Sequence, residues 1–216
     1  IGVQKVVVVF VLLVLFLFFC IMSPAFRTYA TILSIFDYSY YITFMAIGVT
    51  FTLITGGVDL SIGTGMVCYG LLGGFLVTHK GAPVIVGILV AILVAMLFGL
   101  FNGFLVAVLN LPPFIATLGT MMIVRGLGSI FTGGVSITWP QAGAEYGWFR
   151  SIFKVDIGAI KVPLGFLWVL ILVLLMSVVL NKTKTGRYII AIGSNKEATR
   201  LSGVNVVRYQ IMAYVF

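Results

Sequence analysis

The densest group of polar residues inside the apolar part of the chain is the run Thr55 to Gly63 (TGGVDLSIG). Its paired glycines favour a break in the helix, and broken backbone beside a polar pathway is typical of transporters. Asp59 or Ser61 could also cap the next helix by accepting its free N–H groups, which are costly when unpaired near lipid. The two interpretations are compatible, so both residues are candidates for a translocation pathway.

Further polar side chains follow in the next two apolar segments. Neutral hydroxyls and amides suit a polyhydroxylated solute, and hydrogen bonds between helices explain them equally well. Thr117 and Thr120 lie three residues apart and share a helix face. We expect Arg125 to be buried among apolar residues, and favour a structural role for it. The candidate pathway residues are Asp59, Ser61, Asn102, Asn110, Thr117, Thr120 and Arg125.

Residues that could make or break bonds form no recognisable set. The sequence has no nucleophile elbow, no HExxH and no P-loop, and its single histidine, His79, is expected at a solvated loop edge. Cys20 and Cys68 lie in apolar runs without metal-ligand spacing. We predict no catalytic residue, no metal site and no cofactor, so a membrane-embedded enzyme is the weakest alternative.

The composition requires lipid as the solvent for most of the chain. Of the 216 residues, 62% are hydrophobic and 8% are charged, whereas about 25% of the residues of a soluble domain are charged. This excludes a soluble enzyme, a disordered tail and a nucleic-acid-binding domain. The net charge of +8 is better explained by basic cytoplasmic loops than by a nucleic-acid partner.

Uncharged stretches of membrane-spanning length predict an all-α, polytopic transmembrane bundle. The chain starts at Ile1 without a methionine and stops at Phe216 inside an apolar run, so we expect a fragment truncated at its C-terminus. We treat residues 1–216 as one transmembrane domain. Its predicted spans are 6–22, 38–55, 60–78, 82–109, 114–131, 162–180 and the start of another at 209.

Loop charges orient this bundle. The segment 181–208 holds six basic residues against one acid, Glu197, and basic loops stay in the cytoplasm. Counting back over six spans puts the N-terminus, with Lys5, on the same side. The segment 132–161, whose charges are mixed, is then an outer loop.

Small residues predict close packing of the helices. Ala91, Ala95, Gly99, Gly103 and Ala107 recur every four residues along one face of the fourth span. Because lipid gives helices no hydrophobic drive to associate, close backbone approach must hold them together. We therefore expect a packed bundle, although glycine and alanine are generally enriched in membrane helices.

The basic segment 181–208 also contains a predicted short helix. Ser194 and Glu197 have the spacing of a capping box, and Gly203 is placed to end the helix in a left-handed conformation. Ala198 and Leu201 lie three residues apart on one face. Since so short a helix is not stable alone, it needs a partner surface, either the protein's own or another subunit's.

Three runs of sequence, in this order, resemble one known family. They are Thr55–Gly63, Gly99–Arg125 (GLFNGFLVAVLNLPPFIATLGTMMIVR) and Thr185–Gly203 (TGRYIIAIGSNKEATRLSG). They resemble the permease subunits of ABC importers for ribose, xylose, arabinose, galactose and related monosaccharides, within the branched-chain amino acid/sugar permease superfamily. The likeness runs from about the second span to the end. Glu197 begins a match to the coupling motif Glu-Ala-Ala-xxx-Gly, in which Thr199 replaces the second alanine.

The resemblance implies a bundle like that of the vitamin B12 importer permease, multi-pass in a bacterial cytoplasmic (inner) membrane. It implies that the chain hydrolyses nothing itself and that a separate ABC ATPase subunit docks on the short helix. A second permease copy, in a homo- or heterodimer, would complete the pathway, and an extracytoplasmic sugar-binding protein would deliver a monosaccharide. The implied ATPase contact comprises Glu197, Ala198, Thr199, Arg200, Leu201, Ser202 and Gly203.

The main alternative from another class is an ion-coupled secondary carrier of small polar solutes. Such a carrier needs intramembrane ionisable groups to bind the coupling ion, and only Asp59 and Arg125 are available. An ABC permease for another solute, such as a nucleoside, also remains open because these motifs do not select the sugar.

Overall fold

A computed structural model describes residues 2–141, 143–157 and 160–216. Its elements are α1 (Val3–Met22), η1 (Pro24–Arg27), α2 (Tyr29–Ile54), α3 (Ile62–Lys80), α4 (Val84–Ala107), α5 (Pro113–Thr132), η2 (Gly147–Ile152), β1 (Lys154–Ile157), β2 (Ile160–Pro163), α6 (Gly165–Lys182), α7 (Lys184–Ser194), α8 (Lys196–Leu201) and α9 (Val206–Val215). The five helices α2 to α6 are long and apolar enough to cross a membrane. The expected polytopic helical bundle is therefore confirmed.

Several expectations concern residues outside this description. Ile1, the side chain of Lys5, and residues 142, 158 and 159 of the predicted outer loop lie outside the described part of the chain.

α2 and the segment between α5 and α6 differ from what the apolar pattern predicted. α2 begins at Tyr29, well before residue 38, because Thr28 caps it by accepting a hydrogen bond from the Thr31 N–H. In the segment expected to be an outer loop, β1 and β2 form an antiparallel hairpin in which Lys154 lies opposite Pro163. This hairpin is a small addition to an otherwise helical fold.

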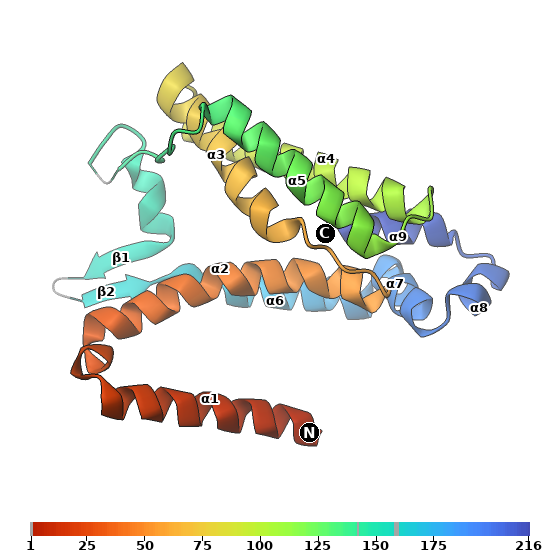
Figure 1. The fold of residues 1–216 in the computed structure, drawn as a ribbon, viewed down its shortest axis with the longest axis horizontal. Coiled ribbons are helices and arrows are strands. Elements are labelled where there is room, and N and C mark those ends of the chain that lie inside the picture. The colour runs from red at the N-terminus through yellow and green to blue at the C-terminus, as the bar shows by residue number, and fades with distance from the viewer. Residues whose placement is uncertain (1, 142, 158–159) are drawn as a thin grey trace.

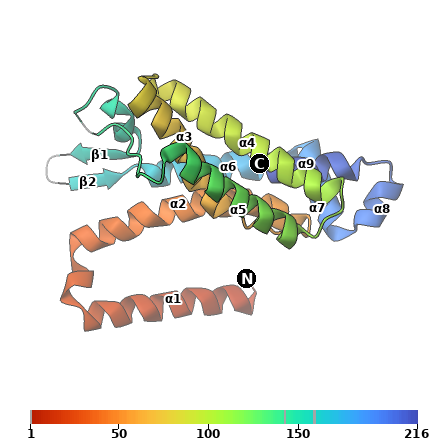
Figure 2. The same ribbon diagram turned by 45° about the horizontal axis from the view of Figure 1, so that its top comes forward.

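The helices form two groups that lie side by side (Figure 1). α3, α4, α5 and α9 make up one group, in which α4 packs against both α3 and α9. α2 and α6 pack together in the other, and α7 and α8 lie at one end of both groups (Figure 1). α1 is joined to α2 through η1 but lies apart from the other α-helices (Figure 2), and nearly all its apolar side chains are exposed.

Glycines allow the closest helix contacts. A Cβ on Gly99 would collide with the backbone of α9 at Tyr214, and one on Gly103 would lie 2.8 Å from the Cα of Ile211. Part of the small-residue stripe on α4 therefore faces α9, as close backbone approach requires. The sequence indicated that α4 has a close neighbour, and the structure identifies that neighbour.

The segment between α5 and α6 is anchored to the helices. Trp139 donates from its indole nitrogen to the Gly70 carbonyl oxygen at 3.1 Å and packs against the glycines of α3 and α4. Arg150 donates to the Trp139 carbonyl oxygen at 3.1 Å. Lys154 makes an ion pair with Asp37 of α2 at 2.6 Å. These contacts hold the described part of the segment against both groups of helices.

Candidate functional site

The chain leaves the helical conformation between α2 and α3, over residues 55–61. Gly56 has a φ of 79°, in the left-handed region that favours glycine. A Cβ on Gly57 would collide with the hydroxyl of Tyr214. Gly56 is thus favoured by its backbone conformation, and Gly57 by its closeness to Tyr214. The predicted break in the helix is present. We call residues 55–61 the polar break.

Asp59 organises the end of the polar break. Its Oδ1 accepts hydrogen bonds from the Ser61 N–H at 2.8 Å and from the Ser61 hydroxyl at 2.6 Å. Ser61 occupies the position before α3, but its side chain accepts no hydrogen bond from the helix. The expectation of a cap is therefore wrong for Ser61, whereas Asp59 does accept the N–H of the residue immediately before the helix. The Asp59 carboxylate reaches only two residues ahead, and it fixes the Ser61 hydroxyl away from the helix N–H groups.

Asn102, near the C-terminal end of α4, completes this cluster. Its Nδ2 donates to Ser61 Oγ at 2.9 Å and lies 3.4 Å from Asp59 Oδ2. The residue is 1% exposed, and its Oδ1 has no hydrogen-bond partner among the described residues. Because an unpaired buried carbonyl costs about 1–3 kcal/mol, this oxygen is an acceptor available for one more donor.

Thr117 joins α5 to the polar break, whereas Thr120 does not. The Thr117 hydroxyl oxygen accepts from the Leu60 N–H at 3.2 Å, and its proton can go to the Pro113 carbonyl oxygen of α5 at 2.9 Å or to the Val58 carbonyl oxygen at 3.2 Å. Thr120 is equally buried, but its hydroxyl bonds to a carbonyl of its own helix at 3.1 Å. The two threonines share the buried face of α5 as expected, but only Thr117 contacts the break.

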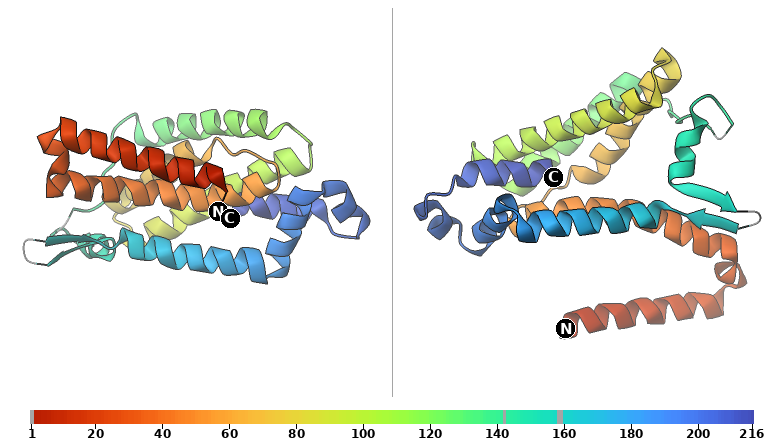
Figure 3. Two further views of the ribbon diagram at one scale, coloured as in Figure 1. Left: turned by 90° about the horizontal axis from the view of Figure 1, so that it is seen from below. Right: turned by 180° about the vertical axis from the view of Figure 1, so that it is seen from behind.

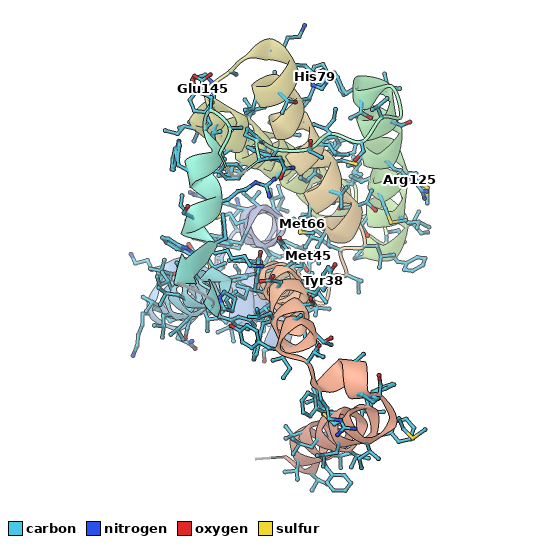
Figure 4. The ribbon with its side chains drawn as sticks, turned by 90° about the vertical axis from the view of Figure 1, so that its left-hand side faces the viewer. Tyr38, Met45, Met66, His79, Arg125 and Glu145 are labelled. Atoms are coloured by element: carbon cyan, nitrogen blue, oxygen red, sulfur yellow. The ribbon has the colours of Figure 1, made fainter. Side chains whose placement is uncertain are left out.

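Two other predicted pathway residues lie away from this cluster. Asn110 is exposed just beyond the end of α4, with a φ of 54°. Arg125 is exposed on the outer side of α5 (Figure 4) and makes no hydrogen bond or ion pair among the described residues. The expectation that Arg125 is buried is wrong. Val124 lies on the buried face, and the next residue is turned by about 100° around the helix.

Sequence reasoning missed the contribution of α9. The Tyr214 hydroxyl and Gln210 Oε1 are buried and have no partner among the described residues. These residues lie one turn apart on α9, which packs against α4 next to the polar break. The glycine stripe on α4 signalled a close neighbour, but its spacing could not tell which helix would supply these polar atoms.

The second predicted site is α8, and its start differs from the expected one. The N-cap is Asn195, whose Oδ1 accepts from the Ala198 N–H at 2.9 Å. Ser194 is the last residue of α7. The expected capping box between Ser194 and Glu197 is therefore wrong by one residue, because Asn195 has the extended backbone that a cap needs and Ser194 is still helical.

The end of α8 agrees with the prediction. Gly203 has a φ of 80°, and its N–H bonds to the Arg200 carbonyl oxygen at 3.0 Å. The Val204 N–H bonds to the Thr199 carbonyl oxygen at 3.4 Å, which completes a Schellman motif. A left-handed glycine thus ends α8 as expected.

α8 presents most of the predicted ATPase contact to the outside. Thr199 is buried, whereas Leu201 is 75% exposed. The face shared by Ala198 and Leu201 is therefore not covered by the described residues. The other exposed members of the predicted contact are Glu197, Arg200, Ser202 and Gly203.

An ion pair on α8 fixes its charged face. Arg200 donates from Nε to both carboxylate oxygens of Glu197, at 3.1 and 3.2 Å. This hydrogen bonding lowers the pKa of the Glu197 carboxyl below its ordinary value. The exposed end of the helix therefore carries a paired acid and base beside the apolar side chain of Leu201.

Comparison with known proteins identifies the family. Residues 31–216 match the family model described as branched-chain amino acid transport system / permease component. The chain belongs to this permease family. The match begins near the start of α2 and includes both the polar break and α8. No solved structure matches this permease.

Curated relatives of the permease are proteins of sugar import. The fructose import permease protein FruG of Bifidobacterium longum is 35% identical, the ribose import permease protein RbsC of Escherichia coli 32%, and the galactose/methyl galactoside import permease protein MglC of Salmonella typhimurium 34%. Each match covers 94% of this chain and 61%, 62% and 64% of those relatives. The chain thus spans less than two thirds of their length.

Proposed function

We propose that the chain is the membrane-spanning permease subunit of an ATP-driven importer that carries a monosaccharide. The observation that carries this proposal is the similarity of 94% of the chain to import permeases for fructose, ribose and galactose. The polar break supports it, because its side chains offer hydrogen bonds suited to a neutral, hydroxyl-rich solute. We infer no catalytic step in this chain, and ATP is hydrolysed by a separate ATPase subunit.

In this proposal the polar break lines the translocation pathway. Irregular backbone at membrane depth is tolerated only inside protein or beside a water-filled cavity. Asp59, Ser61, Asn102 and Thr117 form the wall, and Asn102 Oδ1 supplies an unused acceptor. Thr120 supports the buried face of α5 behind this wall.

Arg125 and Asn110 mark where the pathway opens to water. A guanidinium that faces lipid is costly, so the exposed side of α5 that carries Arg125 faces the aqueous pathway or a second permease copy. Asn110 lies at the cytoplasmic mouth, beyond the end of α4. We infer that the pathway is completed between two copies, whether identical or different.

α8 is the proposed docking site of the ATPase. Its short length and its exposed Leu201 fit a helix that a partner covers. The basic character of residues 181–208 places it in the cytoplasm, together with the N-terminus, in a bacterial inner membrane. Thr199 faces this protein, and the other contact residues face the ATPase.

The outer segment is the proposed receiver of the sugar-binding protein. The described residues between α5 and α6 lie at the opposite end of the helices from α8 (Figure 1). Trp148 is 55% exposed there, on η2. The contacts of Trp139 and Lys154 hold this surface in a fixed place relative to α2 and α3.

Sugar uptake into vesicles tests the proposed function. The full-length permease is reconstituted with its ATPase, ATP inside the vesicles and the sugar-loaded binding protein outside. We expect uptake that needs all three components. Uptake that is unchanged when the ATPase is omitted would overturn the proposal.

A further inference from the structure

α7 is a helix that the sequence pattern did not predict, and it packs against α2, α6 and α9 at one end of the molecule (Figure 3). Thr183 caps it by accepting from the Gly186 N–H at 3.2 Å. Ile189 is fully buried in a cluster with Phe51 of α2 and Ala213 of α9. α7 is therefore held by helices from both groups.

The last turn of α7 lies directly on the backbone of α2. A Cβ added to Gly193 would collide with the Ile54 carbonyl oxygen and would lie 3.3 Å from Ile54 Cγ2. Gly193 is followed two residues later by Asn195, the cap of α8. Only two residues, Ser194 and Asn195, thus separate the helix that carries the proposed ATPase contact from this backbone contact.

Ile54 is the last residue of α2, and the polar break begins immediately after it. The end of α2 holds the beginning of the break by hydrogen bonds from the Gly56 N–H to the Leu53 carbonyl and from the Gly57 N–H to the Thr52 carbonyl, both at 3.0 Å. A displacement of Ile54 must therefore move the chain that leads to Asp59.

We propose that the contact between Gly193 and Ile54 transmits movement of α8 to the polar break, with Gly193 as a positioning residue. This inference rests on the proposed function, since it assumes that the ATPase moves α8. A contact between two backbones with no side chain between them leaves little slack, because densely packed protein transmits displacement. The glycine keeps this contact close, and the exposed face of α8 stays free for its partner.

The first test compares Gly193→Ala with Gly126→Ala in the complete transporter. An added Cβ at Gly126 meets open space, so it controls for the loss of a helical glycine. We expect Gly193→Ala to bind the ATPase and hydrolyse ATP while the sugar imported per ATP falls about tenfold. Gly126→Ala is expected to keep the ratio of the unmodified transporter.

A second readout follows the polar break itself. A cysteine replaces Val58, which is partly exposed, in a chain whose Cys20 and Cys68 are serine. The rate at which a membrane-impermeant thiol reagent labels this cysteine is expected to change on ATP binding. In Gly193→Ala we expect the labelling rate to be the same with and without ATP. A merely structural role of Gly193 would not remove this response to ATP.

Ile54→Ala keeps the experiment decisive if Gly193→Ala does not assemble. It leaves the backbone contact in place but removes the side chain that packs beside it, without adding an atom, so we expect a smaller loss of sugar imported per ATP in the same direction. Unchanged coupling and an unchanged labelling response in whichever variants assemble would overturn the inference. An unmodified transporter that shows no ATP-dependent uptake would instead overturn the proposed function.

Discussion

Asn102 Nδ2 lies 2.9 Å from Ser61 Oγ, so a side chain near the C-terminal end of α4 fixes the residue that precedes α3. Both residues are buried in a bundle whose other contacts are mainly apolar. A hydrogen bond in such surroundings is strengthened, and leaving either partner unpaired is costly. The position of the polar break is therefore set by α4 and does not depend on the break's own glycines alone.

Exchanging the acid and the amide tests this cluster. In Asp59→Asn the new amide nitrogen replaces one of the two carboxylate oxygens. It then faces either the amide nitrogen of Asn102 or the donors of Ser61, and in both cases a hydrogen bond is lost. We therefore expect sugar uptake to fall while insertion and assembly persist. The double exchange Asp59→Asn with Asn102→Asp restores one donor and one acceptor across the 3.4 Å contact. Uptake should therefore recover partly in the double variant. Normal uptake in Asp59→Asn alone would show that the charge is not needed.

The two buried threonines of α5 provide a matched pair. Thr117→Val leaves the Leu60 N–H without its acceptor, at a cost of about 1–3 kcal/mol in the free energy of unfolding. Thr120→Val removes a hydroxyl that bonds only within α5, and less than about 1 kcal/mol is expected. Denaturant unfolding in detergent measures both. Equal losses would contradict the role of Thr117 in holding the break.

Alanine substitutions of Glu197 and Glu145 distinguish a loss of ATPase docking from a general effect of removing a carboxylate. Glu197→Ala removes the carboxylate from the exposed face of α8, so we expect weaker coupling of ATP hydrolysis to sugar import with normal membrane insertion. Glu145→Ala, in the exposed outer segment, is the control and should leave coupling unchanged. Sugar-dependent ATP hydrolysis is the measurement, and a normal value in Glu197→Ala counts against docking at this residue.

The ion pair on α8 predicts a pH dependence. The hydrogen bond from Arg200 lowers the pKa of the Glu197 carboxyl, so any stabilisation by the pair is present above the ordinary carboxyl pKa. It is lost as the pH falls through the lowered pKa. Arg200→Ala should raise the pKa of Glu197 towards its ordinary value. Carbon-13 NMR of the Glu197 carboxyl group measures this pKa in both proteins; an unchanged Glu197 titration would contradict the pairing.

Much of the helical layout followed from the sequence because long apolar runs have few stable forms in lipid. The polar break and the left-handed Gly203 were also predictable, since each depends on local backbone chemistry. The direction of Arg125 was not, because it depends on which side of α5 is covered by α3 and α4. The one-residue error between Ser194 and Asn195 arose because both residue types cap helices.

The outer hairpin and the polar atoms of α9 could not be predicted for a different reason. β1 (KVDI) and β2 (IKVP) do alternate polar and apolar residues, but over only four residues each, which is too short a run to distinguish a strand from a loop. The ion pair between Lys154 and Asp37 joins residues far apart in the chain. Tyr214 reaches Gly57 only because Gly99 lets α9 approach α4 closely. Such contacts depend on the packing of distant segments, which spacing along one segment does not contain.

Measuring which energy source drives sugar uptake is the most direct test of the claim that the chain belongs to an ATP-driven importer. Sugar uptake is followed in vesicles that hold the full-length permease, its ATPase and a fixed ATP supply, with the binding protein outside, before and after an ionophore collapses the proton gradient. We predict that uptake follows the internal ATP and continues after the collapse. Uptake that stops on collapse while ATP stays high would contradict an ATP-driven importer and favour an ion-coupled carrier.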